Sequence, residues 1–500
     1  MNERTSIPIS KIFSIVPLGF EGSLIEVEGN KTQGLPAFNL VGLASKTVTE
    51  SRERVRSAIR ASGFSFPTDR LTINLAPAEL TKDGPHLDLP IALSVMVLSG
   101  QLSPKNLEHS IFVGELSLEG TLRPVRGIIN IVETASKLGF KRVFLPYENL
   151  AQASLASDIQ LIGVSTLKEL FLHLTNQVLI SNKPSAPQSS SAQQSEITLD
   201  DIYGQALAKR ALEIAIAGHH NLLLSGPPGA GKTMLAKAAA SLLPPLSRAE
   251  QISVTKIHSL SQPDKVIINP PFRSPHHNSS TSAIVGGGRK NAPGEISLAH
   301  LGILFLDELP EFPRNILEAL RQPLEDKTIT ISRANLKVTY PADFLLIATM
   351  NPCPCGYFGD STHTCTCSSA QIANYQNKIS GPLLDRIDLY LDVENIDPKH
   401  LLSKHRTNTH NVVKNNITEV LKTQKQNQRF NSSLSATEII KYCNLDTSTK
   451  DFLDTAANKL SLSSRSYFKT IRVAKTIADL AHSTTINSEH ISEALIFRKH

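Results

Sequence analysis

The chain has 500 residues, of which 40% are apolar and 19% are charged, and its formal net charge is +6. This length exceeds what one hydrophobic core usually serves and predicts about two to four domains. The longest apolar run, 91–98, is too short to cross a bilayer, and the first residues lack the apolar region of a secretory signal. We therefore expect a globular protein of the cytoplasm with no membrane partner.

Residues 1–180 alternate strand-like and helical stretches, which predicts an α/β domain. Strands are expected at 71–75 and 111–118, and helices at 49–61, 88–98 and 127–138. The following segment, 181–196, is rich in Ser, Gln and Pro and has no periodic apolar pattern. Such a composition is typical of a flexible linker, so we expect it to separate two domains.

A glycine-rich loop follows an apolar run at 222–224 and precedes a helix-like stretch at 234–243. It consists of Gly226, Pro227, Pro228, Gly229, Ala230, Gly231, Lys232 and Thr233. In the order strand, loop and helix, this is the P-loop pattern, in which backbone N–H groups surround a triphosphate at a helix N-terminus. Lys232 is predicted to reach the β- and γ-phosphates, and Thr233 to offer its hydroxyl to Mg²⁺. The segment 197–396 is therefore predicted to be a second α/β domain that binds ATP.

An apolar strand at 303–306 ends in two carboxylates, Asp307 and Glu308. A P-loop needs such a partner, because the Mg²⁺ that bridges the phosphates must be held and the attacking water must be activated. Asp307 is predicted to hold the metal, directly or through water. Glu308 is predicted to orient or deprotonate the attacking water.

Three further polar residues are candidates for the catalytic site. Asn351 ends the apolar strand that begins at 344 and resembles a sensor 1 group near the γ-phosphate; an Asn that only opens the turn before a proline is the alternative. Arg386 is interpreted as an arginine finger delivered to the ATP of a neighbouring subunit, against the alternative of a surface Asp–Arg pair. Arg465 matches the sensor 2 arginine of helical lid domains.

The last segment, 397–500, lacks strand signals and is predicted to be a helical lid. Ile471, Ala474, Ile477, Ala478 and Ala481 form one apolar stripe at helical spacing, which we interpret as core packing. From residue 399 to the end there are 16 Lys and Arg against 8 Asp and Glu, so a polyanion would dock here. A basic surface without a partner is the alternative.

Four of the five cysteines form two C-x-C pairs, Cys353 with Cys355 and Cys365 with Cys367. Four thiolates can close a tetrahedral structural Zn²⁺ site. The spacing is not the commoner C-x-x-C, so free buried thiols and redox chemistry remain open, and His363 is a substitute ligand.

The segments AHLGILFLDELPEF, ATMNPCPCGYFGD, SGPLLDRIDL and SSRSYFKTIRVAKTIADL resemble the magnesium-chelatase-like family of AAA+ ATPases, in its ComM (YifB) branch. The resemblance covers nearly the whole chain. It implies a homo-hexameric ring, a presensor hairpin at 328–340 and a DNA-contacting insert at 273–294. In such a hairpin Arg333 and Lys337 would touch a threaded DNA strand; the alternative is that they are solvated charges without a partner. A metal site at His276 and His277 in that insert is not expected.

The N-terminal region is similar to the Lon-type protease domain, which has the fold of ribosomal protein S5. The similarity rests on the segments 81–86 and 114–127. Lon-type proteases carry a catalytic serine and lysine where this chain has His86 and Ile129. We therefore expect the fold without proteolysis, as a module for assembly or substrate docking.

The leading hypothesis is a ring-forming ATPase that moves on single-stranded or branched DNA and promotes branch migration during recombination. Its contacts would be mostly to the phosphate backbone and therefore sensitive to salt. Two alternatives stay open: a chelatase-like ATPase that remodels a protein partner, and an ATP-switched scaffold that hydrolyses slowly.

Overall fold

The computed structural model describes residues 9–42, 46–80, 82, 84–156, 159–181, 197–263, 265–288, 292–333, 336–360, 363–395, 409–427 and 429–499, without the side chains of 46–49, 333 and 336. Most of the expected linker, 182–196, lies outside these residues, as does the side chain of Arg333. In the described part of the chain, no helix is long and apolar enough to cross a membrane.

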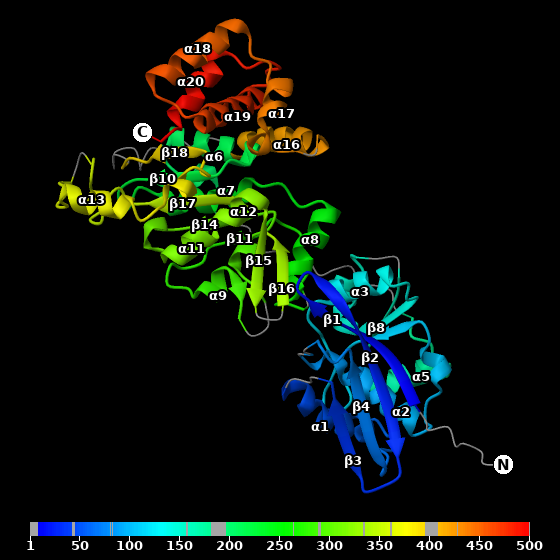
Figure 1. Ribbon diagram of the computed structural model, residues 1–500. Coiled ribbons are helices and arrows are strands. Elements are labelled where there is room, and N and C mark those ends of the chain that lie inside the picture. Colours follow the sequence, from blue (N-terminus) through cyan, green and yellow to red (C-terminus); the bar gives the residue numbers. More distant parts are fainter. Residues whose placement is uncertain are drawn as a thin grey trace.

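The N-terminal region is built on a seven-stranded mixed sheet with the order β3-β4-β2-β1-β5-β8-β9 (Figure 1). Its strands are β1 (Ile9–Leu18), β2 (Glu21–Thr32), β3 (Ala37–Val41), β4 (Arg70–Ala76), β5 (Ser110–Phe112), β8 (Arg142–Pro146) and β9 (Gln160–Val164). Its helices are α1 (Lys46–Ala61), α2 (Asp88–Leu98), α3 (Ile128–Lys137), α4 (Leu150–Ala153) and α5 (Leu167–Leu174). The sheet and α2 share a core in which nearly every residue of α2 is buried.

One sequence expectation in this region is wrong in detail. The run 111–118, expected as a single strand, is divided into β5 and the short β6 (Glu115–Leu116), which pairs with β7 (Leu122–Arg123) in a separate ribbon. The division falls at Gly114, whose N–H donates to His86 O at 3.1 Å instead of to a neighbouring strand.

The second region contains a five-stranded parallel sheet with the order β11-β14-β17-β10-β18. Its strands are β10 (Leu222–Ser225), β11 (Phe272–Arg273), β14 (Ile303–Leu306), β17 (Leu345–Met350) and β18 (Leu389–Asp392). Helices around it are α6 (Ala206–Gly218), α7 (Lys232–Leu242), α8 (Arg248–Ser259), α9 (Thr281–Ile284), α10 (Glu295–Leu298), α11 (Arg314–Ala319), α12 (Arg321–Asp326), α13 (Ser369–Gln376) and α14 (Gly381–Leu384). All four residues of β14 are buried, as expected for a strand covered on both faces.

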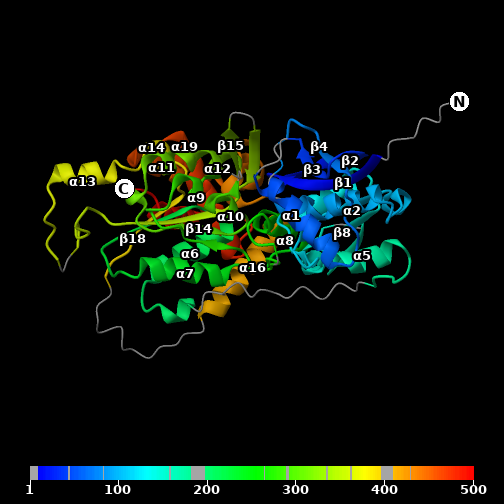
Figure 2. The same ribbon diagram turned by 90° about the horizontal axis from the view of Figure 1, so that it is seen from below.

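Two antiparallel ribbons project from this core. The expected hairpin is present as β15 (Thr328–Arg333) and β16 (Leu336–Pro341), and a smaller ribbon pairs β12 (Gly286–Gly287) with β13 (Ala292–Pro293). The hairpin lies on the side of the core that faces the N-terminal region in both views (Figures 1 and 2).

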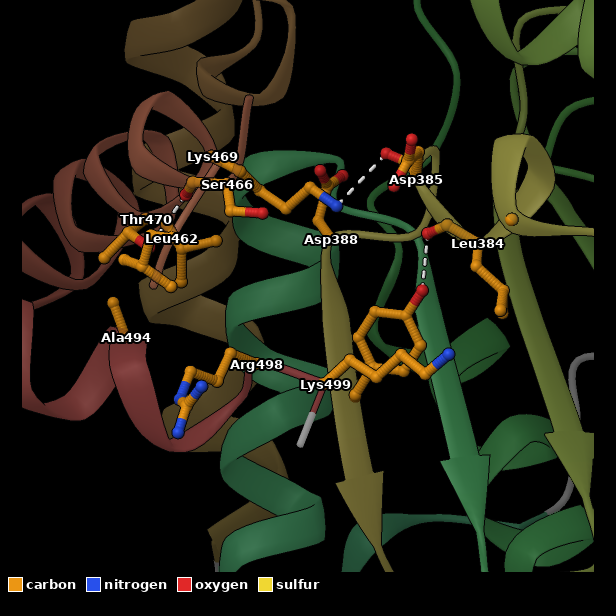
Figure 3. Close-up of a pocket in the computed structure, with 13 residues that line it drawn as sticks. Leu384, Asp385, Asp388, Leu462, Ser466, Lys469, Thr470, Ala494, Arg498 and Lys499 are labelled. Atoms are coloured by element: carbon orange, nitrogen blue, oxygen red, sulfur yellow. Dashed lines mark hydrogen bonds between the residues drawn. The ribbon is translucent and has the colours of Figure 1, made fainter. Parts of the chain in front are cut away.

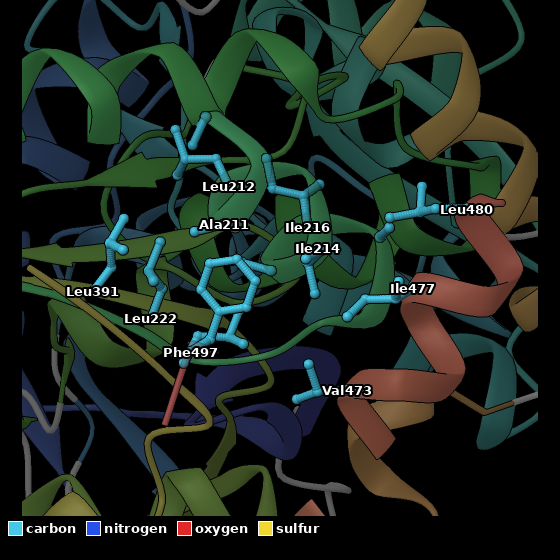
Figure 4. Packing of buried hydrophobic residues seen from close by; sticks show 14 of the residues in the cluster. Ala211, Leu212, Ile214, Ile216, Leu222, Leu391, Val473, Ile477, Leu480 and Phe497 are labelled. Atoms are coloured by element: carbon cyan, nitrogen blue, oxygen red, sulfur yellow. The ribbon is translucent and has the colours of Figure 1, made fainter. Parts of the chain in front are cut away.

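The C-terminal region is helical, as expected, and shares one hydrophobic core with the parallel sheet. It consists of α16 (Thr409–Gln426), α17 (Ala436–Tyr442), α18 (Thr447–Lys459), α19 (Ser464–Leu480) and α20 (Ser488–Ile496). Ile477 of α19 points toward Ile214 of α6, while Phe497, just after α20, packs beside Leu222 of β10 (Figure 4). The predicted apolar stripe of α19 is buried except for Ala481, which ends the helix and is exposed.

The fold class is therefore confirmed for the parallel α/β core with its helical C-terminal region. The resemblance of the N-terminal region to the Lon-type fold stays a prediction.

Candidate functional site at the carboxyl end of the parallel sheet

The glycine-rich loop connects β10 to α7 at the carboxyl end of the sheet. Gly229 and Gly231 have φ angles of +84° and +85°, a conformation that side chains disfavour. Gly226 is required for a different reason, because a Cβ atom there would lie 2.2 Å from the carbonyl oxygen of Val393. The loop therefore has the backbone shape that turns N–H groups toward an anion at the start of α7.

Lys232 is the first residue of α7 and is buried, with 9% of its surface exposed. Its Nζ donates to Gly226 O at 2.5 Å, to Pro227 O at 2.9 Å and to Asn351 Oδ1 at 3.2 Å. Burial lowers the pKa of Lys232, and the nearby carboxylates Asp307 and Glu308 oppose that effect. The structure thus brings the P-loop lysine and the predicted sensor asparagine into direct contact.

The predicted Mg²⁺ ligands also meet. Thr233 Oγ1 donates to Asp307 Oδ2 at 3.1 Å, across the gap between α7 and the end of β14. A hydroxyl and a carboxylate at this separation are hard oxygen ligands that can share an Mg²⁺ ion bound to phosphates. The residues at this position therefore fit a Mg²⁺–ATP complex.

Glu308 follows directly and has a left-handed backbone, with φ at +55° and ψ at +53°. A non-glycine residue in this conformation is uncommon and is held by its surroundings. Its N–H donates to Thr349 Oγ1 at 3.0 Å, and the same hydroxyl donates to Asp307 Oδ1 at 2.5 Å. Thr349 is fully buried and so connects the backbone of one predicted catalytic carboxylate to the side chain of the other.

The carboxylate of Glu308 is about half exposed and has one histidine beside it. Nδ1 of His277 lies 3.8 Å from Glu308 Oε2, and the ring of His277 meets Phe312 edge to face. The insert that carries His277 thus reaches the predicted catalytic base.

Arg386 lies at the other end of the sheet. Its carbonyl oxygen accepts from Asn221 Nδ2 at 2.9 Å, and Asn221 immediately precedes β10, whereas the P-loop follows β10. The four residues of β10 separate the two ends by about 13 Å. The guanidinium of Arg386 is paired with Glu325 of α12 and donates to Pro382 O. Arg386 is therefore not brought to the P-loop of its own chain.

Arg465 lies near the same end of the sheet. It is exposed in the first turn of α19, one turn before Lys469, whose Nζ donates to Ile387 O at 2.6 Å and to Asp385 O at 3.1 Å. Lys469, Asp385 and Asp388 line a cavity of about 230 Å³ between the core and the C-terminal helices (Figure 3). Lys469 thus hydrogen-bonds the helix that carries Arg465 to the segment that carries Arg386.

The four clustered cysteines converge beside the P-loop. Their Sγ atoms all lie within 4.8 Å of one another, and the separations from Cys353 to Cys355 and Cys365 are 3.3 and 3.7 Å. A tetrahedral Zn²⁺ with Zn–S bonds of about 2.3 Å would place its sulfurs about 3.8 Å apart, so the cluster, completed by Cys367, fits a metal ion. A Cβ on Gly356 of this loop would lie 2.7 Å from Pro228 of the P-loop.

The two positions compared with the Lon-type dyad carry no nucleophile and base. His86 Nε2 lies 3.3 Å from Arg126 O, while Ile129 is fully buried in α3. The segments that carry them are close together, but a buried isoleucine cannot act as a base.

The parallel sheet order, the P-loop, the carboxylate pair that follows β14 and the asparagine that follows β17 define a P-loop ATPase of the AAA+ class. Comparison with known families agrees. The family described as magnesium chelatase, subunit ChlI, matches residues 198–401, and related descriptions of ChlI and its C-terminal part match 27–149 and 407–498. The chain belongs to the magnesium-chelatase-like AAA+ family.

Similar chains extend over nearly its full length. Competence protein ComM of Haemophilus influenzae is 42% identical over 495 residues, which cover 97% of each chain. Uncharacterized protein YifB of Salmonella typhimurium is 42% identical over 96% of this chain and 95% of its own, and YifB of Escherichia coli is 40% identical over 98% and 97%. The predicted ComM/YifB relationship is therefore confirmed, and with it a family of ATPases that use ATP and Mg²⁺.

Sequence reasoning missed three residues that contact the predicted site. Thr349 could have been found, because it lies two residues before Asn351 and side chains alternate along a strand. His277 and Glu325 gave no signal, since 31 and 61 positions separate them from their partners, Glu308 and Arg386.

Proposed function

We propose that this protein is a ring-forming motor of the cytoplasm that hydrolyses ATP to move on DNA, most specifically to promote branch migration during recombination or integration of incoming DNA. The observation that carries the motor assignment is the convergence of Lys232, Thr233, Asp307 and Asn351 on one phosphate site. In the reaction, Glu308 would orient and deprotonate water, and an Mg²⁺ ion held by Thr233 and Asp307 would supply charge neutralisation of the phosphates.

The position of the arginines supports a ring. Arg386 lies about a strand's length from the P-loop of its own chain, and Arg465 is exposed near the same end of the sheet. To reach an adjacent subunit, the largely buried guanidinium of Arg386 would leave its pair with Glu325. In a head-to-tail ring, each subunit would present this end of its sheet to its neighbour's nucleotide. We propose that Arg386 stabilises the transferring phosphoryl group in trans, that Arg465 supports it, and that the ring is a homo-hexamer.

DNA as the substrate rests on charge and on one relative's name. Lys337 is exposed on the hairpin, and the C-terminal segment has 16 basic against 8 acidic residues. The relative from Haemophilus influenzae is called a competence protein. Backbone contacts of this kind predict affinity that falls with salt and little sequence preference.

The test is to measure ATPase activity and binding of the full chain with no DNA, single-stranded DNA, forked DNA and a four-way junction. We expect stimulation by at least one DNA, with the junction migrated only when ATP is hydrolysed. Absence of binding and of stimulation by all of them would overturn the DNA assignment and favour a remodelling ATPase or a slow ATP-switched scaffold.

We further propose that Cys353, Cys355, Cys365 and Cys367 hold a structural Zn²⁺, which would fix the loop after Asn351 against the P-loop. Elemental analysis of the purified protein should give about one Zn²⁺ per chain, as expected for a Cys₄ site. Cys365→Ser should lose the metal, whereas Cys443→Ser, at a buried cysteine outside the cluster, should keep it. Metal-free protein with four reduced thiols, or with a disulfide in the cluster, would contradict the proposal.

A further inference from the structure

The turn between β1 and β2 packs directly on the presensor hairpin. Gly19 in this turn has a φ of +62°, and a Cβ atom there would lie only 2.2 Å from Cγ1 of Val338 on β16. Phe20 joins the hydrophobic cluster that contains Val338 and Tyr340, and Lys256 Nζ lies 4.1 Å above its ring. The turn therefore touches the middle of the hairpin without space between them.

The turn is itself held by buried polar groups of α3. Asn130, which is fully buried, donates from Nδ2 to Gly19 O at 3.1 Å, and Gly22 N donates to Thr134 Oγ1 at 3.0 Å. Because both ends of the turn are hydrogen-bonded to α3, we expect the turn to keep its position against the hairpin.

The N-terminal region is in turn fastened to the core at α8 and the loop after it. Glu133 of α3 pairs with Lys256 of α8 at 2.5 Å. Asn149 and Gln152, both fully buried, donate to the carbonyl oxygens of Pro263 at 2.9 Å and Lys265 at 2.5 Å. Buried side-chain amides with partners across the boundary specify one docking geometry, because a shifted geometry would leave them unpaired.

On the same face of the hairpin, Ile331 lies opposite Val338 and meets the insert, since a Cβ on Gly286 would lie 2.7 Å from Ile331 Cδ1. The opposite face carries Lys337 and Thr339, which are exposed, and Thr330, which is half-buried. The hairpin is thus supported on one face by the N-terminal turn and by the insert, and its polar face is left outward.

We propose that Gly19 and Phe20 are positioning residues: the N-terminal region acts as a brace that sets the hairpin's angle, so that its polar face engages DNA and DNA binding is communicated to the ATPase site. The inference rests on the proposed action on DNA. It gives the N-terminal region a mechanical function that needs no catalytic dyad.

The test uses two glycines of the same region. Gly19→Ala adds a methyl against Val338, whereas Gly100→Ala adds one at a similar φ of +73° with nothing within 4 Å. Both variants bear a similar backbone strain, so a difference between them reports the contact of the new methyl group with Val338. We expect Gly19→Ala to keep its DNA-free ATPase rate and to lose DNA stimulation by about 5-fold or more, the size of an ordinary coupling effect. Gly100→Ala should behave as the parent.

A second substitution separates bracing from general damage. Val338→Ala removes the Cγ1 atom that the new methyl meets, so the Gly19→Ala, Val338→Ala double variant should regain stimulation relative to Gly19→Ala alone. Full stimulation in Gly19→Ala, or the absence of rescue, would overturn the brace.

Hydrogen exchange keeps this test independent of the DNA assignment. Amides of 328–333 and 336–340 should exchange faster in Gly19→Ala than in Gly100→Ala, without any DNA present. If no DNA stimulates the parent protein, the proposed function fails, while unchanged exchange in Gly19→Ala shows separately that the brace is wrong.

Discussion

The two ends of the parallel sheet differ in what their charged side chains are paired with. At the carboxyl end, Lys232 donates to Asn351 and Thr233 donates to Asp307, so the residues predicted to bind phosphate and Mg²⁺ pair within one chain. At the amino end, Arg386 is paired with Glu325, a partly exposed carboxylate with no place in the predicted chemistry. The proposed ring predicts this difference, because in it the amino end would complete the nucleotide site of a neighbouring subunit.

The largest expected effect is at the amino end. Arg386→Ala should lower kcat for ATP by about 1,000-fold, the size of the effect of an arginine that stabilises a transferring phosphoryl group, while nucleotide binding persists. Single-turnover hydrolysis and binding of a fluorescent ATP analogue would measure the two separately. Loss of nucleotide binding instead would mean that Arg386 supports the fold of its own chain.

Mixing tests whether the two ends come from different subunits. Neither Arg386→Ala nor Lys232→Ala should turn over alone, but in a mixed ring some interfaces join an intact P-loop to an intact arginine. With equal amounts, about a quarter of the interfaces of a head-to-tail ring are complete, and activity should reappear accordingly. Mixtures that stay inactive would argue that both residues act within one chain.

At the carboxyl end, Glu308→Gln should lower kcat by about 100-fold or more, because the amide cannot accept the proton of the attacking water. ATP binding and ring assembly should be retained, as measured by nucleotide affinity and sedimentation. If this variant hydrolysed ATP at the parental rate, Glu308 would not be the catalytic base.

A substitution of Thr349, at the same end of the sheet, should lower kcat by less than Glu308→Gln. Thr349→Val keeps the shape but loses the hydroxyl that joins the Glu308 N–H to Asp307, so kcat should fall by about tenfold. Thr349→Ser keeps the hydroxyl and should retain most of the rate. The KM for ATP should change less than kcat in both variants; equal losses in Val and Ser would point to packing alone.

The smallest effect on the ATPase rate is expected from Glu325, the carboxylate that pairs with Arg386. Glu325→Gln weakens the pair that competes with binding in trans and should raise the ATPase rate at low protein concentration by about twofold, since the Glu325 side of this ion pair is about half exposed to solvent. Glu318→Gln, which removes the nearby pair with Arg321, is the matched control and should change nothing. A lower rate in Glu325→Gln would show that Glu325 presents Arg386 instead of restraining it.

The features that could be predicted from sequence are local. The P-loop, the strand before Asp307 and the 17-residue helix that carries Arg465 each depend on one continuous stretch of chain, so the pattern suffices. The division of the run 111–118 was missed because it depends on His86 O, and the contact of Gly19 with Val338 depends on how two regions dock. Both are set by packing between distant segments, which periodicity does not encode.

The separation between the two ends of β10 has a consequence for regulation in the cell. Because a rigid sheet keeps Arg386 and Lys232 of one subunit apart, an isolated subunit would bind ATP yet hydrolyse it slowly. Specific activity should therefore rise with protein concentration and fall on dilution, as in any enzyme whose active form is an assembly. Abundance of the protein, or its recruitment to one place on DNA, would then switch the motor on without a dedicated activator.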